Sequence, residues 1–145
     1  MIAVDTNILV HAHRSDSPWH EPAAQSVRSL AEARASWAIP WPCLYEFLSI
    51  VTHPRIWVPP TPVPLALEQV DAWLDAPGLV LLGESTAHWS RLRPLLLAGR
   101  IQGPRVHDAR IAALCLQHQV RLLWTADRDF SRFPDLACHN PLVGG

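Results

Sequence analysis

Short apolar segments alternate along this chain with longer segments of helical character. Each apolar segment has three or four residues, a length that a strand of a buried sheet can have. Consecutive strands joined through a helix pair in parallel, because such a connection returns the chain to the same end of the sheet. The alternation therefore predicts an α/β fold in which helices cover a parallel sheet.

The strands are expected at residues 2–5, 37–39, 79–82, 121–124 and 137–139, and the helices at 22–35, 42–52, 65–75, 85–98 and 103–118. The segment 53–64, HPRIWVPPTPVP, contains five prolines among its twelve residues. Proline interrupts helices and central strands, so this segment is irregular. Because neither side of it would make a full domain, we expect an internal loop and a single domain over residues 1–145.

The composition indicates a globular chain, with 49% hydrophobic and 17% charged residues. No apolar run approaches the roughly 20 residues of a membrane span, and the first residues lack the basic region of a signal peptide. The three cysteines lie far apart and fit neither a disulfide framework nor a zinc site. We therefore expect a cytoplasmic protein without a membrane partner.

The basic residues exclude some chemistry. The net charge is −1, so no global field attracts nucleic acid. All twelve basic residues are arginines. Without lysine the chain has no P-loop, and no lysine can act as a base or form a Schiff base.

Two predicted strands end in polar residues. Asp5 follows the apolar residues IAV and precedes Thr6 and Asn7, and Asp127 follows LLW with Thr125 between them. Each aspartate could simply cap a helix, because a short side-chain oxygen accepts hydrogen bonds from the free N–H groups of a first turn. However, the ligand crevice of open α/β sheets lies outside the carboxyl ends of the strands. The two acidic strand ends therefore point to one place.

Two further carboxylates lie in helical segments. Glu46 is the single charged residue of WPCLYEFLSIV (41–51), and we expect this apolar helix to bury it beside a partner, a metal or a proton. Asp108 begins an apolar stripe that continues through Ile111 and Cys115. The alternatives are a half-exposed Glu46 paired with an arginine, and an Asp108 that stabilises the N-terminus of its helix.

Carboxylates that converge repel one another. Two unit charges about 4 Å apart cost about 4 kcal/mol at an effective dielectric constant of about 20. A cation removes this cost, and an all-oxygen site selects Mg²⁺ or Mn²⁺ over zinc. Such an ion lowers the pKa of a bound water and offsets the charge of a phosphate. The residues therefore predict metal-dependent hydrolysis of phosphodiester bonds.

The motifs also resemble a known family. VDTN, a glutamate in an apolar mid-chain helix, HDARIAAL and TADRDF stand in the order found in PIN-domain nucleases. The stretch LYEFLSIVTHPRI (44–56) and the closing FSRFPDL and NPL add to the likeness. Within that family the chain is most similar to the VapC-type toxins of bacterial toxin–antitoxin pairs. No single motif is specific, whereas all four in this order are.

The resemblance implies a three-layer α/β/α PIN-like fold and an endoribonuclease that uses Mg²⁺, for which Mn²⁺ can substitute. The catalytic and metal-binding residues that it implies are Asp5, Glu46, Asp108 and Asp127. The supporting residues that it implies are Thr6, Asn7, Thr125 and Asp129. Asp5 and Asp108 are the expected direct metal ligands, and Asp129 is either a fifth carboxylate or only a helix cap.

The resemblance also implies partners: an RNA substrate, a cognate VapB-type antitoxin and a second copy in a homodimer. Five arginines in one stretch could line an RNA groove, pair with antitoxin carboxylates or form a solvated face: Arg91, Arg93, Arg100, Arg105 and Arg110. Most of the seven tryptophans are expected in the core, with Trp57 as the candidate for exposure.

Other classes of function fit less well. A non-catalytic PIN-like module would bind RNA or protein without cutting, and the loss of an acidic position would favour it; none is lost. A haloacid-dehalogenase-like phosphatase would need a second aspartate where Asn7 stands, and a serine hydrolase would need G-x-S-x-G. His11 and His13 form only a weak metal pattern, and we expect them at the surface.

Overall fold

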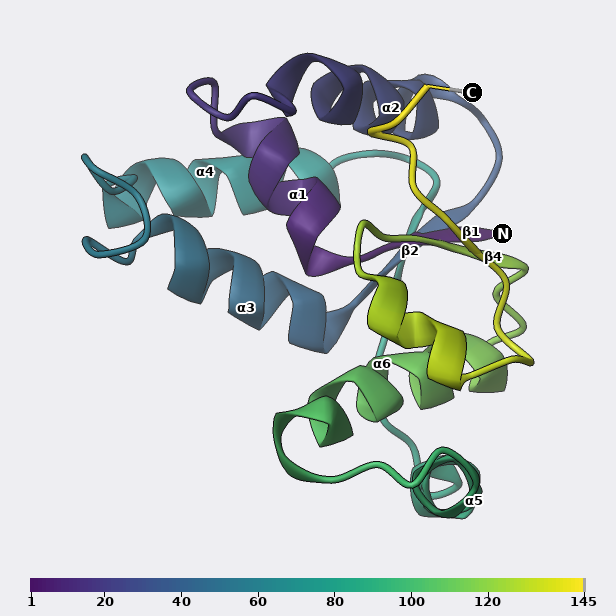
Figure 1. Cartoon of the computed structure of the whole chain (residues 1–145). Helices are drawn as coiled ribbons and strands as arrows, with labels where there is room; N and C mark the ends of the chain where they lie inside the picture. Colours follow the sequence, from purple (N-terminus) through teal and green to yellow (C-terminus); the bar gives the residue numbers. More distant parts are fainter. Residues whose placement is uncertain (145) are drawn as a thin grey trace.

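A computed structural model describes residues 1–144, in which a five-stranded parallel sheet separates two groups of helices (Figure 1). The strands are β1 (Ile2–Val4), β2 (Trp37–Pro40), β3 (Leu79–Leu82), β4 (Leu122–Trp124) and β5 (Cys138–His139). The α-helices are α1 (Thr6–His13), α2 (His20–Glu32), α3 (Trp41–Val51), α4 (Val63–Leu74), α5 (His88–Ala98) and α6 (Val106–Gln117). Short 3₁₀ helices are η1 (Gly103–Arg105) and η2 (Arg128–Arg132).

The order of the strands in the sheet is β3-β2-β1-β4-β5, and all neighbours pair in parallel. The chain first moves from β1 outward to β3, then returns past β1 to β4 and β5. Because parallel crossovers are right-handed, this reversal puts α1 to α4 on one face and α5, α6 and η2 on the other (Figure 1). The predicted three-layer α/β/α fold is confirmed.

The core lies around the central strands. Ala3 and Val4 of β1 are fully buried, and all four residues of β2 are buried. The large side chains of Trp37 and Phe47 fill the space beside them. Burying these apolar strands on both faces holds the carboxyl end of β1 rigidly between β2 and β4.

Helix α1 is an element that the sequence pattern did not predict. It begins directly after Asp5, whose Oδ1 accepts a hydrogen bond from the backbone N–H of Thr6 at 2.8 Å. Its residues Ile8, Leu9 and Val10 are all buried, so the segment lacks the 3.6-residue spacing of apolar and polar positions that indicates a helix.

The proline-rich segment is an ordered loop that packs on the end of α1. The guanidinium of Arg14 lies 4.8 Å from the ring centre of Trp57 and donates to Thr61 Oγ1 at 3.1 Å. Trp57 is therefore half-buried, and its expected exposure was wrong; the exposed tryptophans among the described residues are Trp19, Trp41 and Trp89.

The surface positions expected for His11 and His13 were also wrong, since both side chains are half-buried. Nδ1 of His11 lies 2.7 Å from Ser17 Oγ. His13 contacts Gln69 Oε1 and Thr61 Oγ1, at 3.1 and 3.2 Å. Both histidines therefore join α1 to neighbouring segments and do not form a metal pair.

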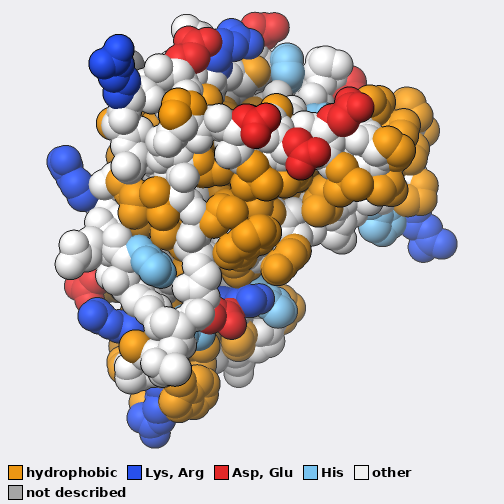
Figure 2. Space-filling model, turned by 180° about the vertical axis from the view of Figure 1, so that it is seen from behind, with side chains coloured by type: hydrophobic (Ala, Val, Ile, Leu, Met, Phe, Trp, Pro, Cys, Tyr) orange, Lys and Arg blue, Asp and Glu red, His pale blue; other side chains and the backbone are white. Residues whose placement is uncertain are grey.

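Hydrophobic side chains gather across one face of the molecule (Figure 2). Large apolar residues are exposed on three of the helices: Trp41, Tyr45, Val63, Leu65, Leu67, Leu74, Trp89 and Leu97. Extended apolar surface of this kind is typical of proteins with partners. None of the helices in residues 1–144 has both the length and the apolar character that crossing a membrane requires.

Candidate metal centre

The topology places the candidate site between β1 and β4, where the direction of the strand order reverses. At such a point the connections leave toward opposite faces and open a crevice at the carboxyl ends of the strands. The backbone N–H of Asp5 donates to the carbonyl of Trp124 at 2.9 Å, so Asp5 and Thr125 stand at the same edge.

Asp5 is buried within this edge, with 4% of its surface exposed. Its Oδ1 accepts from the Thr6 N–H at 2.8 Å and from Cys43 Sγ at 3.5 Å. Its Oδ2 accepts from Thr125 Oγ1 at 2.7 Å and from Asn7 Nδ2 at 3.2 Å. Burial raises the pKa of Asp5, and the hydrogen bonds from Thr125, Thr6 and Cys43 oppose that rise. Asp5 thus caps α1 and also orients the side chains that donate hydrogen bonds to it.

Asn7 and Thr125 connect the two strand ends. Asn7 Oδ1 accepts from the N–H of Ala126 at 3.0 Å, and its Nδ2 lies 3.2 Å from Thr125 Oγ1. Thr125 Oγ1 in turn accepts from the N–H of Asp127 at 3.0 Å. These polar residues therefore hold the backbone that carries Asp127 against α1.

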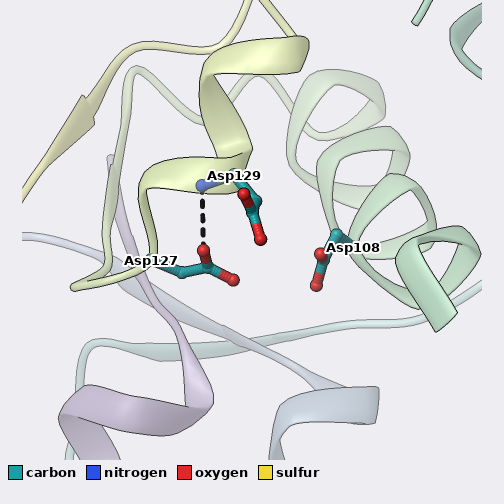
Figure 3. A group of neighbouring side chains, drawn as sticks. All are labelled: Asp108, Asp127 and Asp129. Atoms are coloured by element: carbon teal, nitrogen blue, oxygen red, sulfur yellow. Dashed lines mark hydrogen bonds between the residues drawn. The ribbon is translucent and has the colours of Figure 1, made fainter. Parts of the chain in front are cut away.

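Three carboxylates converge in front of this edge: Asp108, Asp127 and Asp129. One oxygen of each lies within 4.8 Å of one oxygen of the others (Figure 3). Asp108 stands in the first turn of α6, and Asp127 is the N-cap of η2. Oδ1 of Asp127 accepts from the N–H of Asp129 at 2.8 Å, so Asp127 is the cap and Asp129 lies in the first turn of η2.

The pKa of Asp108 reflects its burial and the neighbouring acidic side chains. The pKa of Asp108 is raised to about 6. Burial is the largest cause, and the negative charges of Asp127, Asp5, Glu46 and Asp129 follow in that order. The pKa of Asp108 therefore depends on all the other acidic side chains that the sequence analysis selected. Asp5 and Glu46 themselves lie outside the three-carboxylate group.

Glu46 lies on the exposed side of α3, so its expected burial was wrong. The helix buries Cys43, Leu44 and Phe47 and turns Tyr45 and Glu46 outward. An aromatic residue next to Glu46 made the segment look apolar on every side. The arginine partner is also absent among the described residues, because Glu46 Oε2 instead accepts from the Thr6 hydroxyl at 2.8 Å.

Sequence reasoning missed Cys43 as a residue of the site, and it named Arg105 only as one of five arginines of a groove, a partner contact or a solvated face. Nη1 of Arg105 forms an ion pair with Oδ1 of Asp129 at 2.8 Å, and this pairing raises the pKa of Arg105. Cys43 donates to Asp5, and its thiol pKa is well above the ordinary value, mainly through burial. Cys43 is buried on α3 and Arg105 lies just before α6, so no local pattern marks either residue as a partner of a site acid.

The donor set fits a hard divalent cation. Its converging side chains are carboxylates, and no histidine or cysteine belongs to the group found in residues 1–144. The mutual repulsion that contributes to the raised pKa of Asp108 is the cost that a bound Mg²⁺ or Mn²⁺ would remove. Zinc, which prefers nitrogen and sulfur ligands, fits poorly.

Comparison with known proteins agrees with this geometry. The family model described as PIN domain matches residues 2–136. The chain belongs to the PIN-domain family. This PIN domain is 35% identical to Ribonuclease VapC43 of Mycobacterium tuberculosis over 144 residues, covering 99% of this chain and 97% of the relative. That similarity places it among the VapC proteins.

Solved structures share the fold. The PIN domain matches VapC20 of Mycobacterium tuberculosis, described as a Sarcin-Ricin loop cleaving toxin, with a TM-score of 0.68 and 14% identity. That match covers 90% of this chain and 93% of the other. VapBC2 from Rickettsia felis, solved with a DNA fragment from its promoter, matches with a TM-score of 0.66 and 23% identity, over 97% and 98% of the chains.

Proposed function

We propose that this PIN domain is a metal-dependent endoribonuclease and the toxin of a VapBC-type pair. The observation that carries the proposal is the convergence of Asp108, Asp127 and Asp129 within 4.8 Å at the strand edge that holds Asp5. The relatives named ribonucleases support RNA as the substrate. No acidic position of the motifs is missing, so nothing favours a non-catalytic binding module.

In this proposal, Asp108, Asp127 and Asp129 hold Mg²⁺, which Mn²⁺ can replace. Asp5 does not bind the ion and instead positions the residues next to it. The ion supplies charge stabilisation for the phosphate and lowers the pKa of water. Asp5 fixes the Thr125 hydroxyl, and Thr125 fixes the backbone of Asp127. This differs from the expectation of Asp5 as a direct ligand, because its oxygens already accept four hydrogen bonds.

Glu46 and Arg105 have separate roles in the proposed reaction. Oε2 of Glu46 is held by Thr6, so the exposed Oε1 can accept a proton from an attacking water. Arg105 is ion-paired with Asp129 and can contact a phosphate oxygen of the RNA.

The test is cleavage of a mixed cellular RNA pool by the purified protein with Mg²⁺, with Mn²⁺ and with a chelator. Asp108→Asn and Asp127→Asn should each abolish cutting, while Asp71→Asn, at an exposed aspartate of α4, should leave it unchanged. Cleavage that survives chelation or the Asp108→Asn change would contradict the proposal. Tight RNA binding without any cutting would favour the binding module.

We further propose a VapB-type antitoxin and a second copy as protein partners, in a cytoplasmic protein. Support comes from the similar VapBC2 structure and from the exposed apolar residues of α4 and α5. Co-expression with the product of an adjacent gene, followed by size determination of the purified complex, tests both partners. A chain that stays monomeric and unbound would contradict this part of the proposal.

A further inference from the structure

We propose that Trp41 and Tyr45 form an aromatic platform on which one unpaired base of the RNA substrate stacks beside the acidic site. The inference rests on the proposed nuclease function and adds residues that determine which RNA segment is held. It concerns binding of the base and not the chemical step.

The aromatic platform is already organised without a ligand. Trp41 and Tyr45 stand one turn apart on α3, with ring centroids 5.9 Å apart and planes inclined by 26°. The indole of Trp41 passes close to Gly83, where an added Cβ would lie 3.5 Å from Trp41 Cδ1. Tyr45 is 59% exposed and Trp41 is 37% exposed. Exposed aromatic faces held in place are what sequence-tolerant base stacking requires.

Two hollows lie beside the platform, and Glu46 lines one of them. One, of about 230 Å³, is lined by Pro42, Tyr45, Glu46, His107 and Arg110. The other, of about 270 Å³, shares Tyr45 and Arg110. Because Tyr45 and Glu46 line the same hollow, a base on Tyr45 would lie beside the side chain that we propose accepts the proton of the attacking water.

The charges around the platform favour a nucleotide. Arg110 and the exposed His107 offer donors for a phosphate, while Tyr45 offers a π face for a base. Arg110 is held in place by an ion pair with Glu84. A cation beside a π face matches the phosphate and the base of one nucleotide, and the charged lining disfavours an apolar segment. A single-stranded RNA segment is therefore the occupant that fits.

The experiment measures binding of a short single-stranded RNA and of an abasic ribose-phosphate oligomer of equal length, by fluorescence anisotropy in chelator. Tyr45→Ala should weaken RNA binding about tenfold and leave abasic binding nearly unchanged, because base stacking is lost. Tyr45→Phe should retain binding. Tyr45→Leu, which keeps apolar area without a π face, should behave like Tyr45→Ala. Trp89→Ala, at an exposed tryptophan of α5, is the matched control and should change nothing.

Each outcome decides the proposal. Equal loss on both oligomers, no loss on either, or a wild-type protein that does not prefer RNA over the abasic oligomer would overturn the platform. Unchanged RNA binding with an altered oligomeric state of Tyr45→Ala would identify the surface as a contact between copies and would also overturn it. Because no cleavage is measured, a base-dependent result stands even if the nuclease proposal fails.

Discussion

At the scale of single residues, Asp5 shows how one buried carboxylate serves structure and site together. It is 4% exposed, caps α1 and receives four hydrogen bonds from both sides of the strand edge. A charge at such depth is stable only when donors surround it, so its neighbours are as constrained as Asp5 itself. Thr125 is the most constrained of them, because its hydroxyl contacts Asp5, Asn7 and the Asp127 backbone.

We expect Thr125→Val to lower the free energy of unfolding by about 1–3 kcal/mol, because it removes the 2.7 Å donor of buried Asp5 without changing the shape of the side chain. Urea denaturation at pH 7 measures the change. Thr125→Ser keeps the hydroxyl and should lose much less. A valine variant as stable as the wild type would contradict the prediction.

The raised pKa of Asp108 predicts a dependence of stability on pH. In chelator, the folded protein holds the Asp108 proton up to about pH 6, whereas the unfolded chain releases it near the ordinary value of 3.8. The folded state therefore binds more protons at Asp108 between these values, and the contribution of Asp108 to stability is greatest below about pH 4 and is lost as the pH rises through about 6. The part due to Asp108 is on the order of 1 kcal/mol, since solvent screens a half-exposed group.

Urea midpoints at pH 4, 5, 6 and 7 measure this dependence. Asp108→Asn should flatten it in part, because the raised pKa of Asp5 contributes with the same sign. Asp75→Asn, at an exposed aspartate that follows α4, is the control and should retain the wild-type slope. Identical slopes in Asp108→Asn and the wild type would refute the assignment.

At the scale of elements, Arg14 attaches the proline-rich loop to the end of α1. Its guanidinium makes two hydrogen bonds to Asp16, at 2.9 and 2.6 Å, and stacks over Trp57. A planar guanidinium can satisfy these contacts together, whereas an ammonium cannot. These side-chain contacts hold the loop together with a backbone hydrogen bond from the Thr61 N–H to the Val51 carbonyl at 2.7 Å.

We expect Arg14→Lys to release this loop and to raise the amide exchange rates of residues 53–62 about tenfold, with a smaller change in the rest of the chain. Hydrogen exchange followed by mass spectrometry measures the rates segment by segment. Arg28→Lys, at an exposed position of α2, should leave the exchange pattern unchanged. Equal protection of the loop in both variants would show that the prolines alone hold it.

At the scale of the whole molecule, the proposed metal site would couple ion binding to folding. The three converging aspartates come from α6 and η2, and unfolding separates them. An ion that binds only the folded state stabilises it by mass action. The same ion would also reverse the rise in the pKa of Asp108, since a positive charge favours the carboxylate.

We expect Mg²⁺ at a hundredfold excess over its Kd to raise the free energy of unfolding by about 2.7 kcal/mol. Thermal melts with increasing Mg²⁺, compared with sodium chloride at the same ionic strength, measure the shift. Asp127→Asn should reduce it strongly. A wild-type protein equally stable with both salts would speak against a metal site.

Much of the architecture was determined by the sequence itself. The positions of the strands, the irregular loop and the three layers depend on local patterns that each segment carries alone: apolar length, proline and the order of the motifs. The loop ends at residue 62 and not at 64, because proline is tolerated in the first turn of α4. The nearness of Asp5 and Asp127 also followed, because parallel strands deliver their carboxyl ends to one edge.

Only the tertiary structure decided which of the acidic residues lie together in the three-carboxylate group and which lie outside it. Glu46 is exposed because α3 turns Cys43 and Phe47 inward, and the rotation of a helix that is apolar on most sides depends on what packs against it. The three-carboxylate group includes Asp129, paired with Arg105, and leaves Asp5 behind it because α6 and η2 meet on the face opposite α1. Distances between elements far apart in the chain are set by packing, which no local pattern encodes.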